Sequence, residues 1–316
     1  MHRGRSSGGG RGEGVRGPCP RLGHGPALIA AGLVVAACWA SASRAADAAA
    51  GGRYNAVANE PHEIQAAMPE GKPEVSTREV AMALAGTRTG APLDLSGRSL
   101  RYLDLAGLVL KDARLSGADL WGIDLTETDL TRADLSGSRL NRSSLTRARL
   151  DGANLERATI LRPTIHTSFG FDWKDAPSFD GANLRGARLV GRLDGTSFRG
   201  ADLTGADFST YEPRPGQGTL VTRRGTDLNG CDFSGATLAG ADFTTAALEF
   251  ARFPGADLRG ARLVDAALAK ADFTGADLTG ADLTGADVYD AVLVGAKGLD
   301  TVKGLDGAKN ADKSIR

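Results

Sequence analysis

The sequence predicts a solenoid, a fold in which one short structural unit repeats along an axis. From about Pro92 to about Leu293 the chain advances in steps of five, as in the run FTGADLTGADL that begins at Phe273. A fixed internal period outranks local propensity as a fold signal. Five residues match neither the 3.6-residue period of an α-helix nor the two-residue period of an ordinary strand. The chain therefore has to turn a corner every five residues.

An apolar register marks the centre of each step. Its first run is Leu95, Leu100, Leu105, Leu110, Leu115, Leu120, Leu125, Leu130, Leu135, Leu140, Leu145, Leu150, Leu155 and Ile160. A second run, in which Phe is frequent, extends from Phe198 to Leu293. A small residue, usually Ala, stands two positions before many centres, and Gly two positions after many centres relaxes the backbone. Side chains that recur in one register share an interior, so the centres are the predicted core.

With its repeated A-D-L-x-x motif, the chain resembles the pentapeptide repeat family over roughly two thirds of its length. The resemblance implies an all-β fold, a right-handed quadrilateral β-helix in which four pentapeptides form one coil. It also implies that every twentieth residue lies above its predecessor. Some members of this family imitate DNA and inhibit DNA gyrase through a strongly acidic surface.

A leader of residues 1–45 precedes the repeat. It combines an Arg- and Gly-rich stretch with the apolar run 27–40, which is too short for a comfortable membrane span. Small residues of the A-x-A type follow, as at a signal-peptide cleavage site. These features predict a periplasmic or secreted protein. The alternative is a lipoprotein leader, in which VAAC supplies Cys38 for lipidation and the protein is anchored to the membrane.

The remaining segments flank or form the repeat. Residues 46–75 are polar and lack a period, which is typical of a flexible linker. Residues 76–90 begin with STRE, a capping box, and predict a short helix that covers the first coil. Residues 91–296 form the predicted β-helix, and residues 297–316 form a C-terminal cap with a frayed tail. Stacking of coils end to end is a route to a homodimer.

Two insertions, at residues 166–178 and 209–227, interrupt the repeat. Interruptions of a solenoid are where binding surfaces are usually added, and Trp, Tyr and Arg are enriched at recognition hot spots. Counting sides from Leu95 places both insertions beside the third side of the coil. We therefore predict a shallow recognition site, suited to stacking and to an anionic group, formed by His166, Trp173, Arg192, Tyr211, Arg223 and Arg224. The alternative is that both loops fold onto the rod and bury their own aromatic side chains.

Charge patterning argues against the DNA-mimicking activity. The formal net charge is zero, and the late acidic run falls on four successive sides of one coil rather than along one face. That run is Asp272, Asp277, Asp282 and Asp287. A basic run precedes it, namely Arg132, Arg139, Arg142, Arg147, Arg149, Arg157 and Arg162. Only residues 20 positions apart stack on one another, so we interpret the basic run mainly as a solvated surface. The alternative is a patch that binds an anionic polymer or membrane head groups.

Catalytic chemistry has little support in the sequence. It contains no P-loop, no zinc-helix motif and no paired Cys ligands. We therefore expect no enzyme, no cofactor and no metal, and a rigid binding or scaffolding module of the cell envelope. Its expected partner is a protein or an anionic envelope component, not nucleic acid, with membrane contact limited to a lipid anchor. The alternatives are a cytoplasmic DNA-mimicking gyrase inhibitor and a glycan-acting β-helix enzyme that would use Arg192 and Asp194.

Overall fold

The computed structural model divides the chain into two compact units, Met1–Ala58 and Asn59–Arg316. The second unit contains every residue that the structure describes. These residues are 72–86, 92–165, 173–209 and 225–315. The predicted leader, Cys38 and most of the predicted linker lie outside the described residues.

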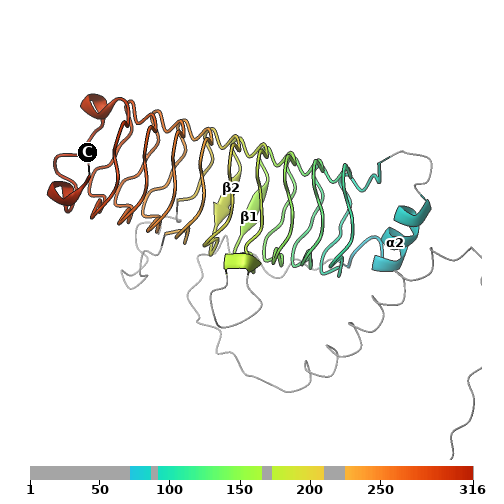
Figure 1. Cartoon of the computed structure of the whole chain (residues 1–316). Coiled ribbons are helices and arrows are strands. Elements are labelled where there is room, and N and C mark those ends of the chain that lie inside the picture. Colours follow the sequence, from blue (N-terminus) through green and yellow to red (C-terminus); the bar gives the residue numbers. More distant parts are fainter. Residues whose placement is uncertain (1–71, 87–91, 166–172, 210–224, 316) are drawn as a thin grey trace, which may run out of the picture. The chain divides into compact units, whose positions relative to one another are not determined.

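The second unit is a stack of coils in which backbone bridges join residues 20 positions apart (Figure 1). Asp94 pairs in parallel with Arg114, and Arg114 pairs with Asp134. In each pairing the chain exchanges two hydrogen bonds with the next coil, as when Leu95 N donates to Arg114 O at 2.8 Å and Arg114 N donates to Leu93 O at 2.8 Å. Four pentapeptides therefore complete one coil, as the sequence predicts.

Most paired segments are single bridges because the chain turns a corner before a longer strand can form. The two strands are β1 (Thr159–Leu161) and β2 (Arg188–Val190), which pair in parallel. We number the four sides of a coil from the centres Leu95, Leu100, Leu105 and Leu110. Each centre is an inward side chain, and the residues on either side of it point outward.

The corners require a left-handed backbone conformation two positions after each centre. Gly117 occupies such a corner with φ 64°, where the lack of a Cβ makes the conformation inexpensive. Other side chains occupy equivalent corners, for example Tyr102 and Arg132, both with φ 58°. The coil geometry therefore imposes this conformation on whichever residue stands there.

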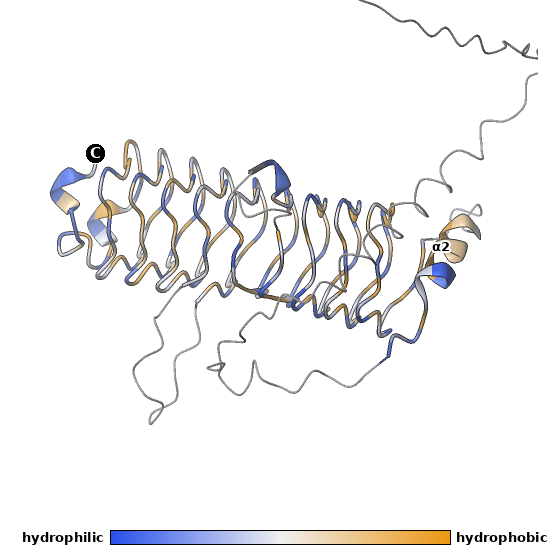
Figure 2. Ribbon diagram, turned by 90° about the horizontal axis from the view of Figure 1, so that it is seen from below, coloured by the Kyte–Doolittle hydropathy of each residue, from blue (hydrophilic) through white to orange (hydrophobic). Residues whose placement is uncertain are grey.

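The centres form one continuous core. Apolar and polar residues alternate along each coil (Figure 2), and the centre side chains from Leu100 to Val288 are buried. On side four the column changes from Leu to Phe above Leu150. Successive Phe rings then stack almost in parallel, at 5.0 Å between Phe198 and Phe233 and 4.8 Å between Phe253 and Phe273. The predicted core is confirmed.

Helix α2 (Thr77–Gly86) precedes the first coil. Its capping box is formed, because Glu79 N donates to Ser76 Oγ at 3.2 Å and Ser76 N donates to Glu79 Oε2 at 2.7 Å. The backbone hydrogen bond from Ser76 is the main reason that the pKa of Glu79 is lowered. Val80 is buried, and Thr77 Oγ1 donates to the carbonyl of Asp104 at 3.1 Å. The helix thus contacts the beginning of the solenoid.

The C-terminal segment differs from the frayed tail that the sequence predicts. It forms another coil, in which Lys297, Lys303, Lys309 and Ile315 pair with Asp277, Asp282, Asp287 and Val292. Its sides are six residues long, and two of them contain the 3₁₀ turns η2 (Leu299–Thr301) and η3 (Ala311–Lys313). The turns absorb the additional residues, so the backbone stays paired although the five-residue motif is lost.

Candidate binding surface

The pairing register defines the first insertion. Arg149 pairs with Ser178, which lies 29 positions further along the chain instead of 20, so this coil contains nine extra residues. Arg147 N donates to Asp175 O at 2.7 Å, a bond that regular coils make to the residue directly after a centre. Asp175 thus occupies the place after the centre Ile165. The extra residues are 166–174, a shorter insertion than the sequence analysis assigns.

The second insertion adds fifteen residues. Asp207 pairs with Asp242, 35 positions away instead of 20, so 15 residues are added. Ser209 and Gly225 occupy the first and second places after the centre Phe208, and the extra residues are 210–224. Fifteen is a multiple of five, so the centres after this insertion keep the five-residue spacing of the centres before it when they are counted along the sequence.

Both insertions border side three, in agreement with the count made from the sequence. Thr164 continues the column of Ser144 on side three, and Ser178 continues that of Arg149 on side four. The second insertion leaves from side two and returns to side three, where Asp227 pairs with Arg192. The coil between the two insertions therefore presents Arg192 on the side that both segments adjoin.

Arg192 lies between two carboxylates on this side. Its Nε is 3.8 Å from Asp194 Oδ2 and 3.8 Å from Asp227 Oδ2, and its side chain is 55% exposed. Asp194 is buried and accepts hydrogen bonds from Asn229 N at 3.1 Å and Asn229 Nδ2 at 3.0 Å. The buried carboxylate is thus held by the next coil, and the Arg192 guanidinium remains accessible above it.

A one-residue deletion shapes the local backbone. Ser178 and Ser197 pair at a spacing of 19 instead of 20, and Gly191 adopts a φ of 136°. A Cβ at Gly191 would lie 2.9 Å from the Cα of Arg162, so only glycine fits this approach of the two coils.

The structure places one of the six predicted site side chains, that of Arg192. His166, Tyr211, Arg223 and Arg224 lie outside the described residues. Trp173 is described in its backbone, where it begins the 3₁₀ turn η1 (Trp173–Asp175). The clustering of these six side chains therefore stays a prediction.

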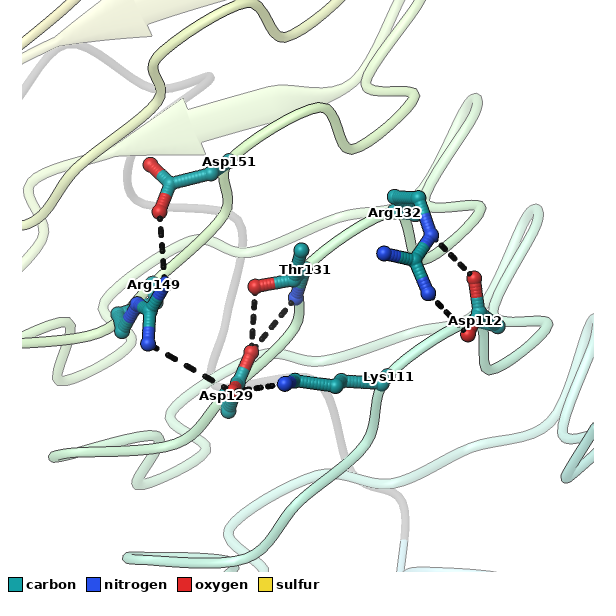
Figure 3. A network of polar contacts seen from close by, with 7 residues as sticks. All are labelled: Lys111, Asp112, Asp129, Thr131, Arg132, Arg149 and Asp151. Carbon is teal, nitrogen blue, oxygen red and sulfur yellow. Dashed lines mark hydrogen bonds and ion pairs between the residues drawn. The ribbon is translucent and has the colours of Figure 1, made fainter.

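Two arginines of the basic run, Arg132 and Arg149, are paired with carboxylates within the solenoid (Figure 3). Arg132 donates to both carboxylate oxygens of Asp112, at 2.8 and 2.7 Å. This pair lowers the pKa of Asp112. Burial raises the pKa of Asp129, but the hydrogen bonds from Thr131 and the nearby Lys111 ammonium outweigh burial and lower it. Carboxylates and cations thus balance each other on side four.

The side-four network extends across the first insertion. Arg149 lies 3.5 Å from Asp151, and Asp151 accepts a hydrogen bond from Ser178 in the next coil. Further along, Asp232 lies 4.0 Å from Arg199 and 3.6 Å from Arg252. Side four therefore presents alternating charge, unlike the continuous acidic face of a DNA mimic.

The sequence analysis missed an aromatic contact on side two. The rings of Tyr102 and Trp121 meet edge to face, with centroids 5.0 Å apart. Neither residue belongs to the repeat motif, and they are 19 positions apart. Comparing outward residues at the 20-residue period could have found the pair.

A model of pentapeptide repeats matches more than half of the chain, with eight copies. The matched residues are 94–132, 109–147, 123–160, 178–209, 226–264 and 261–297. The chain belongs to the pentapeptide repeat family. Proteins of this family are generally non-catalytic structural or binding proteins and fold as right-handed quadrilateral β-helices.

Solved structures share the repeat. HetL, a pentapeptide repeat protein involved in heterocyst differentiation regulation in the cyanobacterium Nostoc, is 28% identical, with a TM-score of 0.50 over 77% of this chain and 100% of HetL. The fluoroquinolone resistance protein QnrB1 is 19% identical, covering 68% of this chain and 95% of QnrB1 with a TM-score of 0.29. A pentapeptide repeat protein of the Arabidopsis thaliana thylakoid lumen is 24% identical, covering 46% and 69% with a TM-score of 0.17. The comparison with curated proteins gave no match.

Within the part of the chain that the structure describes, no helix has the length and apolar character needed to cross a membrane. The same residues contain no group of three or more His, Cys, Asp or Glu side chains that could hold a metal ion.

Proposed function

We propose that this protein is an exported, non-catalytic binding or scaffolding module of the cell envelope. The solenoid is the rigid part, a right-handed quadrilateral β-helix whose first coil is capped by α2. Recognition takes place beside side three, at the two inserted segments. The partner is a protein or an anionic envelope component.

The observation that carries this proposal is the placement of the insertions. Nine and fifteen residues are added beside the same side, while the coils on both sides of each insertion keep their pairing. Long insertions in surface loops cost a fold little stability, and loops on a rigid scaffold are the usual carriers of binding residues. Exposed Arg192 lies on the side between them and can engage a carboxylate or phosphate.

The relative HetL supports a binding role. Its name associates a pentapeptide repeat protein with regulation of differentiation, and proteins of this family are generally non-catalytic structural or binding proteins. The compensated charge of side four favours this role over DNA mimicry.

Aromatic residues of the insertions supply the test of recognition. Full-length protein and the double variant Trp173→Ala/Tyr211→Ala would be used to capture partners from an envelope fraction, with the midpoint of unfolding measured in parallel. We expect the double variant to capture no partner while its midpoint of unfolding stays the same as that of the full-length protein. A lowered midpoint would instead mean that these aromatic side chains pack onto the rod and stabilise it.

Export is tested separately by intact-mass and N-terminal analysis of the protein from fractionated cells. A mature chain that begins near residues 43–46, or a lipidated Cys38, would support an envelope location. An unprocessed cytoplasmic chain would contradict export and make inhibition of gyrase the next activity to assay.

A further inference from the structure

The first four coils carry a group of aromatic and basic side chains on side two and at its corner with side three. We call it the side-two cluster, and its members are Tyr102, Trp121, Arg139, Arg142 and Arg162. The guanidinium carbon of Arg142 lies 5.8 Å from the centroid of the Trp121 ring, and Tyr102 meets the same ring edge to face. Trp121 thus connects the aromatic part of the cluster to its basic part.

A glycine holds the Tyr102 ring in place. A Cβ built at Gly122 would lie 2.9 Å from Cδ1 of Tyr102, so the ring lies directly over this glycine of the next coil. Tyr102 nevertheless remains 49% exposed. The ring is therefore fixed before any partner arrives, which lowers the entropy cost of binding through it.

Arg139 supplies a positive charge that no carboxylate of the described residues offsets. Asp119 stands one coil before Arg139 on the same column, but Arg101 occupies it through Nε at 2.8 Å and Nη2 at 2.5 Å. Arg139 is exposed, and among the described residues no carboxylate lies within ion-pair distance of it. Arg142 and Arg162 lie one coil apart in the neighbouring column.

This positive surface is short. Further along side two the paired positions include Asp207 and Asp242, which lie 3.3 Å from Arg188 and 3.6 Å from Arg262. Four coils span about 14 Å from first to last at the usual spacing of paired strands. Beyond the cluster, side two therefore presents arginines that are already paired with carboxylates, so a long polyanion would gain little there.

We propose that the side-two cluster is a docking surface for a short acidic segment of another protein. Arg139 binds a carboxylate of the segment, since a guanidinium group matches carboxylate geometry. Tyr102 and Trp121 pack against an apolar side chain of the same segment. Tyr, Trp and Arg are the residue types that dominate the energetics of protein interfaces. Single-stranded nucleic acid fits less well, because it needs a longer basic track and successive stacking platforms.

The test uses the full-length protein and a fluorescein-labelled peptide, EELEEL, with binding followed by fluorescence anisotropy at low salt. Arg139→Glu should weaken binding about tenfold, because one charge pair is lost and one repulsion is added. The matched control is Arg114→Glu. Arg114 stands at the same place in the repeat but on side one, and its side chain is 61% exposed. This change should alter the affinity for the peptide by less than about twofold.

A second matched pair tests the aromatic part. Tyr102→Ala should weaken binding about threefold or more, because a preorganised ring is lost. The control is Phe250→Ala. Phe250 stands at the same place in the repeat as Tyr102 but on side three, with a φ of 61° and a side chain that is 56% exposed, so its removal should leave the affinity for the peptide unchanged. Circular dichroism confirms that each variant is folded.

Three outcomes would overturn the proposal. The first is no measurable binding of the peptide by the unmodified protein. The second is an equal loss of affinity in Arg139→Glu and Arg114→Glu, which would indicate general charge attraction. The third is tighter binding of oligothymidylate or oligogalacturonate than of the peptide, which would assign the cluster to another class of partner.

Discussion

The coils before and after the first insertion solve the same packing problem with different side chains. Below it, the side-four column consists of Leu110, Leu130 and Leu150. Above it, the column becomes Phe, and Phe rings of opposite sides also meet edge to face across the interior, with 5.8 Å between Phe233 and Phe243. The backbone pairing is the same in both regions. One coil geometry therefore accepts either a Leu core or a Phe core.

The small inward positions differ as well. From residue 236 to residue 291 they are all Ala. Some of these positions in the earlier coils instead hold buried hydroxyl residues, namely Thr128, Ser138 and Ser143. Ser138 Oγ has no hydrogen-bond partner among the described residues, while Ser143 Oγ donates to Leu140 O at 2.7 Å. The coils from residue 236 onward are thus the more regular ones, and the inward hydroxyls without a partner among the described residues, those of Ser138 and Thr196, lie before them.

The largest expected effect comes from truncating a ring. Phe233 contacts rings in its own column and on the opposite side, so Phe233→Ala should lower the free energy of unfolding by about 3–5 kcal/mol. Leu130→Ala is the matched change below the insertion and should cost about 2–5 kcal/mol, at the lower end because fewer ring contacts are lost. Urea unfolding measures both. A larger loss for Leu130→Ala would contradict the view that the ring stack is the more tightly packed core.

Exchanging the two core types gives a smaller effect. Leu130→Phe places a ring among Leu side chains and should cost about 1–3 kcal/mol through overpacking. Phe233→Leu removes less volume than truncation and should cost less than Phe233→Ala. If Leu130→Phe leaves urea unfolding unchanged, the two regions are not distinct in their packing.

Replacing the unpaired hydroxyl should make the earlier region more like the later one. Ser138→Ala removes a buried group with no partner and should stabilise the protein by about 1 kcal/mol. Ser143→Ala removes a hydroxyl that is hydrogen bonded and should be neutral or slightly destabilising. Thermal unfolding of the two variants compares them directly. Stabilisation of equal size in both would show that the hydrogen bond of Ser143 has no net value.

The smallest expected effects are losses of stability at low pH. The carboxylates Asp112 and Asp282 both have lowered pKa values, the first through Arg132 and the second through hydrogen bonds from Thr284. Because their pKa values are lower in the folded protein, the stability they contribute is complete above the ordinary value of 3.8 and is lost as the pH falls through the folded pKa.

NMR titration separates the two causes. Arg132→Gln, or added salt, should raise the pKa of Asp112 toward its ordinary value, since an exposed ion pair is screened. Thr284→Ala should raise the pKa of Asp282, whereas added salt should affect Asp282 less. An equal response of both groups to salt would mean that charge, not hydrogen bonding, dominates in both regions.

The sequence predicts the coil well because the five-residue period marks the centres and the family resemblance implies four pentapeptides per coil. The centres, the four sides and the position of both insertions beside side three follow from them. The extent of the insertions does not, because Ser209 and Gly225 complete one pentapeptide although 15 residues separate them. The last coil was also missed, since its sides have six residues and no longer show the motif.

The candidate site is less predictable than the coil. Arg192 could be placed because it belongs to a counted side. Its partner Asp194 is buried, and the sequence period alone does not indicate burial there. The position of the Tyr102 ring depends on the absence of a side chain at Gly122. The sequence shows that residue 122 is glycine, but it does not show that an aromatic ring lies over it.

The central claim is that the coils carry the fold and the insertions carry recognition. A variant lacking residues 166–174 and 210–224 tests it, because both junctions then continue the pentapeptide register. The measurement is native-state hydrogen exchange at Leu150 and Asp227, whose amides donate to Ser178 O at 2.7 Å and Gly191 O at 2.9 Å beside the junctions. The account predicts protection equal to that of the full-length protein. Loss of protection at these amides would contradict it and show that the insertions hold the coils together.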